Sequence, residues 1–144
     1  MGKRVVGTGS ESSGDPRALS LVAALELLGY ASAGRLIYIR HALPTLHPAG
    51  HLLEGGDLIV FLAATASLGP QRQVVSYQAD PLDPATGLRW CVLVTGISNE
   101  ITDPAEQRHY RTVMPLVAGA RPRLLRIHPE LAERIADLDG VNER

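Results

Sequence analysis

The sequence lacks a second cysteine, so Cys91 cannot form an internal disulfide, and a lone thiol is compatible with a reducing cytoplasm. It also lacks an excess of charge of either sign, because its formal net charge is −1 and its pI is about 6.5. This balance gives no reason to expect nucleic acid or an anionic membrane as a partner. The longest apolar run with helical spacing, 18–28, is far shorter than the ~20 residues that span a bilayer. We therefore expect a cytoplasmic protein with neither a membrane nor a nucleic-acid partner.

The 144 residues are enough for one domain with a sizeable core. Residues 1–15 are polar and rich in glycine and serine, which predicts a flexible N-terminal leader. Residues 16–136 carry the apolar periodicity of a folded domain, and residues 137–144 are expected to form a polar C-terminal tail. The sequence therefore predicts one domain between two polar ends.

Two segments carry clear signals of a helix start. Asp15 followed by Pro16 predicts a helix whose leucines recur at helical spacing and which ends at a glycine. Asp103, Pro104 and Glu106 predict a second start, as cap, first helical residue and capping-box residue. The expected buried stripe of this second helix consists of Tyr110, Val113, Met114 and Val117.

Between and after these helices, short apolar runs follow one another, each closed by Gly, Pro or Asp, which is typical of antiparallel strands. The expected strands are 35–39, 43–53, 58–64, 73–79, 88–101 and 123–128. The segment 54–57 predicts a tight hairpin turn, and the continuous apolar run 58–64 predicts a strand covered on both faces. Residues 129–135 are predicted as a short terminal helix. This order favours a small antiparallel barrel flanked by helices.

His47 and His51 share one face of their expected strand because their spacing is even, and His41 has the same parity. A metal site needs three or more converging ligands, and few acidic residues lie near this segment. We therefore expect these histidines to face the solvent or line the rim of a cavity, without a metal.

Trp90 and Cys91 stand next to each other in the longest strand candidate. Trp90, the only tryptophan, is interpreted either as a core or interface aromatic or as a wall beside a planar ligand. Cys91 is expected to be a buried structural thiol, because no neighbour in the sequence would activate it as a nucleophile.

The strand segments also resemble one family in particular. Residues 34–38 (GRLIY) and 43–51 (LPTLHPAGH) are similar to the first two barrel strands of the pyridoxamine 5′-phosphate oxidase-like proteins, the flavin-binding split barrels common in actinobacteria. Residues 83–96 (DPATGLRWCVLVTG) resemble a later strand of that family. Residues 103–106 and 126–131 resemble its helix start and its last strand. These matches occur in the family's order.

The resemblance implies a mainly β (α+β) fold, a six-stranded antiparallel split β-barrel with flanking helices. It implies a homodimer with two flavin sites at the dimer interface. The implied function is a flavin mononucleotide (FMN)-dependent oxidoreductase acting on a small molecule. The alternative is a non-catalytic dimeric split-barrel protein that binds a flavin, a deazaflavin or a haem-like ligand. Neither interpretation assigns a catalytic side chain.

The resemblance also implies which residues meet the cofactor. Those beside the isoalloxazine ring would be His47, Pro48, Ala49 and Gly50. Those approaching the ring edge, ribityl chain and phosphate would be Leu62, Ala63, Thr65, Ser67 and Leu68. Trp90 would come near the flavin from the partner subunit.

One departure from the family pattern bears on the cofactor. The family commonly has a phosphate-binding lysine in the loop where this chain has Ser67. A phosphate without a cation loses charge-assisted hydrogen bonds, each worth roughly 1.5–3 kcal/mol. Arg72 and Arg40 are candidates to replace that cation. FMN is the implied cofactor, and weak or lost binding, or use of a deazaflavin, are the alternatives.

Overall fold

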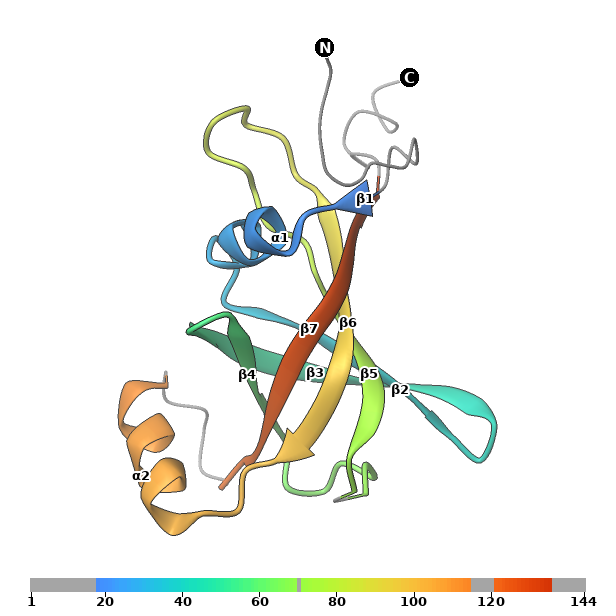
Figure 1. Ribbon diagram of the computed structural model, residues 1–144, viewed down its shortest axis with the longest axis vertical. Helices are drawn as coiled ribbons and strands as arrows, with labels where there is room; N and C mark the ends of the chain where they lie inside the picture. The colour runs from blue at the N-terminus through green and yellow to red at the C-terminus, as the bar shows by residue number, and fades with distance from the viewer. Residues whose placement is uncertain (1–17, 70, 115–120, 136–144) are drawn as a thin grey trace.

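The computed structural model describes residues 18–69, 71–114 and 121–135, which form a closed six-stranded antiparallel barrel with one extra short strand and two helices (Figure 1). The elements are β1 (Ala18–Leu19), α1 (Leu21–Leu28), β2 (Ala33–Arg40), β3 (Leu43–Glu54), β4 (Asp57–Leu62), β5 (Gln73–Ala79), β6 (Cys91–Glu100), α2 (Pro104–Val113) and β7 (Arg123–Ile135). The predicted leader 1–15 and tail 137–144 lie outside the described residues.

The barrel closes because β7 pairs with two strands at once. The strands follow the order β7-β4-β3-β2-β5-β6, and β6 then pairs with β7 again. All of these pairings are antiparallel, as the succession of short strands predicts. Short β1 pairs with the far part of β7, beyond the point where β4 ends. The barrel thus leaves few open sheet edges among the described strands.

Alternating apolar side chains fill the barrel. On β5, Val75, Tyr77 and Ala79 are buried while the residues between them are exposed or partly exposed, as the sequence predicts. The other large inward residues include Leu36, Leu58, Val60, Val92, Val94, Leu125 and Ile127. Helix α1 contributes Ala24 and Leu28 to the same cluster and packs against β6 and β7. One apolar core therefore joins α1 to the barrel interior.

Strand β4 is covered on both faces, which confirms the expectation from its continuous apolar run. Its alternate residues Leu58, Val60 and Leu62 belong to the barrel core. The two between them, Ile59 and Phe61, belong to a second cluster that includes Tyr110 of α2. Helix α2 therefore covers the outside of the barrel over β4 and β7.

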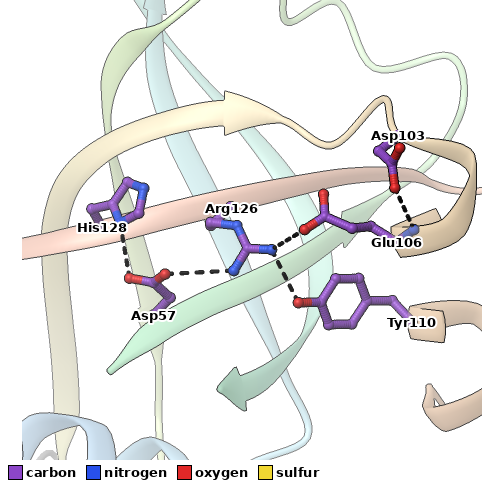
Figure 2. A network of polar contacts seen from close by, with 6 residues as sticks. All are labelled: Asp57, Asp103, Glu106, Tyr110, Arg126 and His128. Atoms are coloured by element: carbon purple, nitrogen blue, oxygen red, sulfur yellow. Dashed lines mark hydrogen bonds and ion pairs between the residues drawn. The ribbon is translucent and has the colours of Figure 1, made fainter. Parts of the chain in front are cut away.

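A polar network supplements this packing (Figure 2). Arg126 of β7 donates hydrogen bonds to Glu106 and to the hydroxyl of Tyr110 in α2, both at 3.1 Å. It also lies 3.5 Å from Asp57 at the start of β4, whose other carboxylate oxygen is 2.9 Å from Nδ1 of His128. Arg126 thus ties two strands to the helix.

Helix α1 begins later than the sequence predicts. Its first residue is Leu21, and the side chain of Ser20 caps it by accepting a hydrogen bond from the Ala23 N–H at 3.1 Å. Ala18 and Leu19 instead form β1, because the edge of β7 offers them backbone partners. The expected start at residues 15–16 lies outside the described residues.

The terminal helix predicted over 129–135 is wrong, because β7 continues as a strand to Ile135. Its second half finds backbone partners in β6 and β1. Pro129 is tolerated because it lies opposite Gly96 at a register shift between Thr95 and Gly96, where the ladder is interrupted. Such a bulge leaves room for a residue that has no N–H to donate.

The second predicted helix is confirmed at its start. Asp103 caps α2 by accepting from the Glu106 N–H at 3.0 Å (Figure 2). Pro104 is the first helical residue. Tyr110 is buried as expected, whereas Val113 is 52% exposed because the helix ends there. Val117 lies outside the described residues. Neither helix of the described chain has the length and apolarity needed to cross a membrane.

Candidate functional site

Strand β3 places its site candidates on two faces. His47, Ala49 and His51 alternate with Pro48 and Gly50, and the burial pattern puts Ala49 and His51 on the barrel's inner side. Gly50 lies on the outer side against Phe61, whose ring would clash with any Cβ at this position. Because the side chains of a strand alternate, a ligand on one side of β3 would meet the side chains that point to that side and only the backbone of the residues between them.

His51 is a core residue rather than a rim residue, so the expectation of a solvent or rim position is wrong for it. Its Nε2 donates to the Leu28 carbonyl at 2.9 Å, and its Nδ1 lies 2.6 Å from the Tyr77 hydroxyl. Since a carbonyl only accepts, the proton resides on Nε2 and Nδ1 accepts from Tyr77. Burial lowers the pKa of His51 and raises that of Tyr77, so both stay neutral near pH 7.

His47 belongs to a polar group at an end of the barrel. Its ring stacks on Tyr38 with the planes 4° from parallel and the centroids 6.0 Å apart. The Tyr38 hydroxyl is 2.9 Å from the Ser67 hydroxyl. The fold therefore brings together His47 and Ser67, both expected at the site, through a residue that sequence reasoning did not select. The signal for Tyr38 was its place on the inner face of β2, two residues after buried Leu36.

The loop 63–69, which follows β4, is held by a cation. Nη1 of Arg123 donates to the carbonyls of Ala66 at 2.9 Å and Leu68 at 2.6 Å. The same guanidinium pairs with both carboxylate oxygens of Glu100, at 2.8 and 3.1 Å. These hydrogen bonds with Glu100 raise the pKa of Arg123, and the two side chains are only 17% and 20% exposed. The ion pair of Arg123 and Glu100 holds the loop in place. No local sequence signal predicts this ion pair, because the two residues are 23 positions apart in the chain.

The remaining candidates in this loop differ in exposure. Ala63 and Thr65 are exposed, whereas Leu62 at the end of β4 and Leu68 in the loop are buried. Ser67 is partly buried because its hydroxyl reaches Tyr38. A ligand at this loop would meet the first two residues and the Ser67 hydroxyl directly.

Trp90 lies next to the end of β6 that is opposite the loop 63–69. It directly precedes β6, whose other end is Glu100, and ten residues at ~3.3 Å each place about 30 Å between the two ends. Trp90 packs against the barrel core, and the Arg134 guanidinium lies 4.6 Å from its ring centre. One ring face is therefore covered by a cation–π contact.

Cys91 is partly buried, and the Gln78 side-chain amide lies 3.3 Å from its sulfur. Burial raises the pKa of this thiol, which keeps it protonated at neutral pH. A protonated thiol is a poor nucleophile, as expected for a structural residue. Among the described residues, no three His, Cys, Asp or Glu side chains are grouped as a metal site.

The outer barrel face carries exposed apolar side chains. Ile39 of β2, Leu46 of β3, Val74 of β5 and Leu131 of β7 are 60, 53, 63 and 51% exposed. The strand registers place them on the outer side together with Ile37. We call these five residues the outer apolar face. Ser76 and Thr95 lie between Ile37 and Leu131 in the register. Exposed apolar side chains that gather on one face are a feature of many interaction surfaces.

A model of the family described as pyridoxamine 5′-phosphate oxidase matches residues 22–136, which include the whole barrel from α1 to β7 apart from Leu21. The chain belongs to the pyridoxamine 5′-phosphate oxidase family. Among its relatives, the uncharacterized protein Rv0080 of Mycobacterium tuberculosis is 35% identical over 120 residues, which cover 78% of this chain and 79% of that protein.

Solved structures share the fold of this family member. The FAD-binding protein from Mycobacterium smegmatis is 19% identical, with a TM-score of 0.63 over 83% of this chain and 97% of that one. The FAD and heme binding protein from the same organism is 14% identical, with a TM-score of 0.58 over 85% of this chain and 74% of that one. At these identities the similarity establishes the split-barrel architecture.

The loop fits one part of FMN better than another. The hydroxyls of Tyr38 and Ser67 can each donate and accept, which suits the ribityl chain of a flavin. A terminal phosphate is a dianion and needs a cation with N–H groups to offer. The cation that contacts this loop, Arg123, already pairs with Glu100 and with two loop carbonyls. The contacts of the loop therefore do not fit a phosphate.

Proposed function

We propose that the protein is a flavin-dependent oxidoreductase that acts on a small molecule. The observation that carries this proposal is the group formed by Tyr38, His47 and Ser67 at the barrel end, in a chain that belongs to the pyridoxamine 5′-phosphate oxidase family. Two proteins with the same fold are described as binding FAD. A bound flavin would supply the hydride chemistry, and the protein would supply binding and orientation.

The residues of the chain divide these tasks. The Ser67 hydroxyl, positioned by the buried Tyr38 hydroxyl, would offer a hydrogen bond to the polar side of a flavin, and the His47 ring would offer an edge or a face. Arg123 and Glu100 hold the neighbouring loop in place. FMN is the form that the sequence resemblance implies, with a deazaflavin as the alternative.

We also propose that the working unit is a homodimer. The outer apolar face would bury its exposed side chains against a second copy, and such burial contributes roughly 25 cal/mol per Å². Trp90 lies next to the end of β6 opposite Glu100, the residue that pairs with Arg123 beside the loop, and the sequence resemblance implies that it meets the flavin of the partner subunit. The site would then be complete only in the dimer.

A spectroscopic titration tests the proposal. Purified protein is mixed with FMN, riboflavin and FAD, and we expect a retained chromophore with bands near 375 and 450 nm after gel filtration, as the chemistry of oxidised flavins gives. We expect NADH or NADPH, added without oxygen, to bleach the band near 450 nm. Failure to retain any of the three flavins would contradict the proposal.

A second candidate is a non-catalytic binding protein for a flavin, a deazaflavin or a haem-like ligand. The observation that favours it is that Glu100, the acid beside the loop, is held by Arg123 and is not available for proton transfer. A chromophore that is retained but is reduced by neither NADH nor NADPH would favour this candidate. Haem added in place of flavin distinguishes the ligands by its own absorption band.

A further inference from the structure

We propose that the loop 63–69 recognises the uncharged, hydroxyl-bearing ribityl chain of a flavin rather than its terminal phosphate, and that Ser67 sets this preference. The ligand class is therefore a flavin whose affinity does not depend on a phosphate. This inference rests on the proposed function, because it concerns the same site.

The charge around the loop disfavours a phosphate. Four N–H groups of Arg123 are engaged, two by the Glu100 carboxylate and two by the Ala66 and Leu68 carbonyls. The positive charge of the guanidinium is matched by the negative charge of Glu100 at 2.8 Å. A phosphate approaching this loop would meet a pair with no net charge, in which the Glu100 carboxylate offsets part of the attraction of the guanidinium.

The type of hydrogen-bonding group at the loop also favours an uncharged ligand. The Ser67 and Tyr38 hydroxyls lie 2.9 Å apart, and because Tyr38 is buried, the partly buried Ser67 hydroxyl is the one that a ligand would meet, as donor or as acceptor. Sugar-alcohol hydroxyls likewise donate and accept, so the two sets match. A phosphate dianion only accepts and is bound best by charged donors. Since Ser67 is only partly buried, its side chain decides whether this position offers a ligand a hydroxyl or a charge.

A competing cation is present further along the chain. Arg72 directly precedes β5 and is exposed, so its side chain has room to move. If Arg72 held the phosphate, FMN would bind more tightly than riboflavin and this advantage would depend on Arg72. The experiment therefore includes a variant of this residue.

The experiment is a fluorescence titration of the full chain with riboflavin and with FMN at low and high salt. We expect the two dissociation constants to agree within about threefold and to respond little to salt, because no net charge is recognised. We expect Ser67→Lys to tighten FMN by about tenfold, the effect of one charge-assisted hydrogen bond, while riboflavin changes little. The matched Ser67→Ala variant should weaken both ligands by the same factor. Arg72→Ala should leave FMN binding unchanged.

The outcomes separate this inference from the proposed function. Wild-type protein that binds FMN more than about tenfold tighter than riboflavin overturns the inference and leaves the proposed function standing. So does an Arg72→Ala variant whose FMN affinity falls to that of riboflavin. Binding of neither ligand overturns both. The wild-type comparison does not depend on whether the Ser67→Lys variant folds.

Discussion

His51 and Tyr77 form a buried hydrogen-bonded pair that stabilises the fold. The other histidines of the chain are more exposed than His51. The Tyr77 hydroxyl lies 2.6 Å from His51 Nδ1 and 3.3 Å from the Ala49 carbonyl. Together with the Leu28 carbonyl on Nε2, these contacts connect α1, β3 and β5. The residue thus holds α1 against the barrel.

Replacing Tyr77 with Phe should destabilise the fold. The variant removes the hydroxyl and leaves His51 Nδ1 buried without its partner, which costs about 1–3 kcal/mol. Chemical denaturation followed by tryptophan fluorescence measures the free energy of unfolding. Tyr30→Phe is the matched control, because Tyr30 is 60% exposed, and it should change stability by less than about 0.5 kcal/mol. Equal stabilities of the two variants would contradict the structural role.

Acidification should destabilise the protein through the same residue. Burial lowers the pKa of His51 from its ordinary value of 6.5. Just below this pH, His51 therefore becomes protonated in the unfolded chain but stays neutral in the folded chain. The contribution of neutral His51 to the free energy of unfolding should therefore be complete above pH 6.5. It should decrease as the pH drops below this value, by up to about 1.4 kcal/mol per pH unit. Urea unfolding between pH 7.5 and 5 measures the slope.

The control for this pH dependence is His51→Gln, compared by slope rather than by absolute stability. The other histidines are present in both proteins, so the difference between the slopes belongs to His51. Identical slopes would show that His51 titrates alike in the folded and unfolded chains.

The sequence predicts the shared face of His47 and His51 but not their different surroundings. Even spacing on a strand is sufficient for the first. The second depends on Tyr77, which is 26 residues from His51 and reaches it only when β3 and β5 are assembled around β2. The same limit applies to Arg123 and Glu100. Contacts between distant residues decide which polar side chains are buried.

At the scale of elements, the strands and turns were predictable because each has a local signal. The hairpin 54–57 places Gly55 and Gly56 at φ of 59° and 88°, a conformation that glycine adopts without strain. The end of β7 was not predictable in this way. Its residues 129–135 begin with a proline and contain good helix formers, but β6 and β1 supply backbone partners that a helix would leave unpaired.

The start of α2 gives a prediction at this scale. Asp103→Ala removes the side chain that accepts from the Glu106 N–H at 3.0 Å, and loss of such a cap costs about 1 kcal/mol. The free energy of unfolding should fall by that amount in urea denaturation. Thr102→Ala, at the preceding exposed position, is the control and should be neutral within about 0.5 kcal/mol. A neutral Asp103→Ala would mean that packing of Tyr110 alone sets the helix.

At the scale of the whole molecule, the outer apolar face yields a test of assembly. Leu46→Lys and Val74→Lys place charges where a second copy would pack, and each buried charge without a partner disfavours association strongly. We expect both variants to be monomers in analytical ultracentrifugation while the wild type is a dimer. Val113→Lys is the control, because Val113 is 52% exposed on α2, outside this face, and should leave the dimer intact.

Flavin binding by the variants that disrupt the outer apolar face tests whether the site needs both subunits. If Trp90 of one subunit contributes to the flavin site of the other, the monomeric variants should also lose flavin affinity. A monomeric variant that binds flavin as tightly as the wild type would mean that each site is complete within one chain. The barrel itself was predictable from strand succession, whereas the proposed dimer would use a surface that no local pattern defines.

The position of β7 in the chain determines when the barrel can close during synthesis of the protein. This strand pairs with β1, β4 and β6, and it is the last element of the described chain to leave the ribosome. Until it emerges, β4 and β6 each have an unpaired edge, and the apolar interior is open. A nascent chain halted before Arg123 would present these edges to other chains, and unpaired strand edges favour association between chains. The barrel closes only when β7 is present.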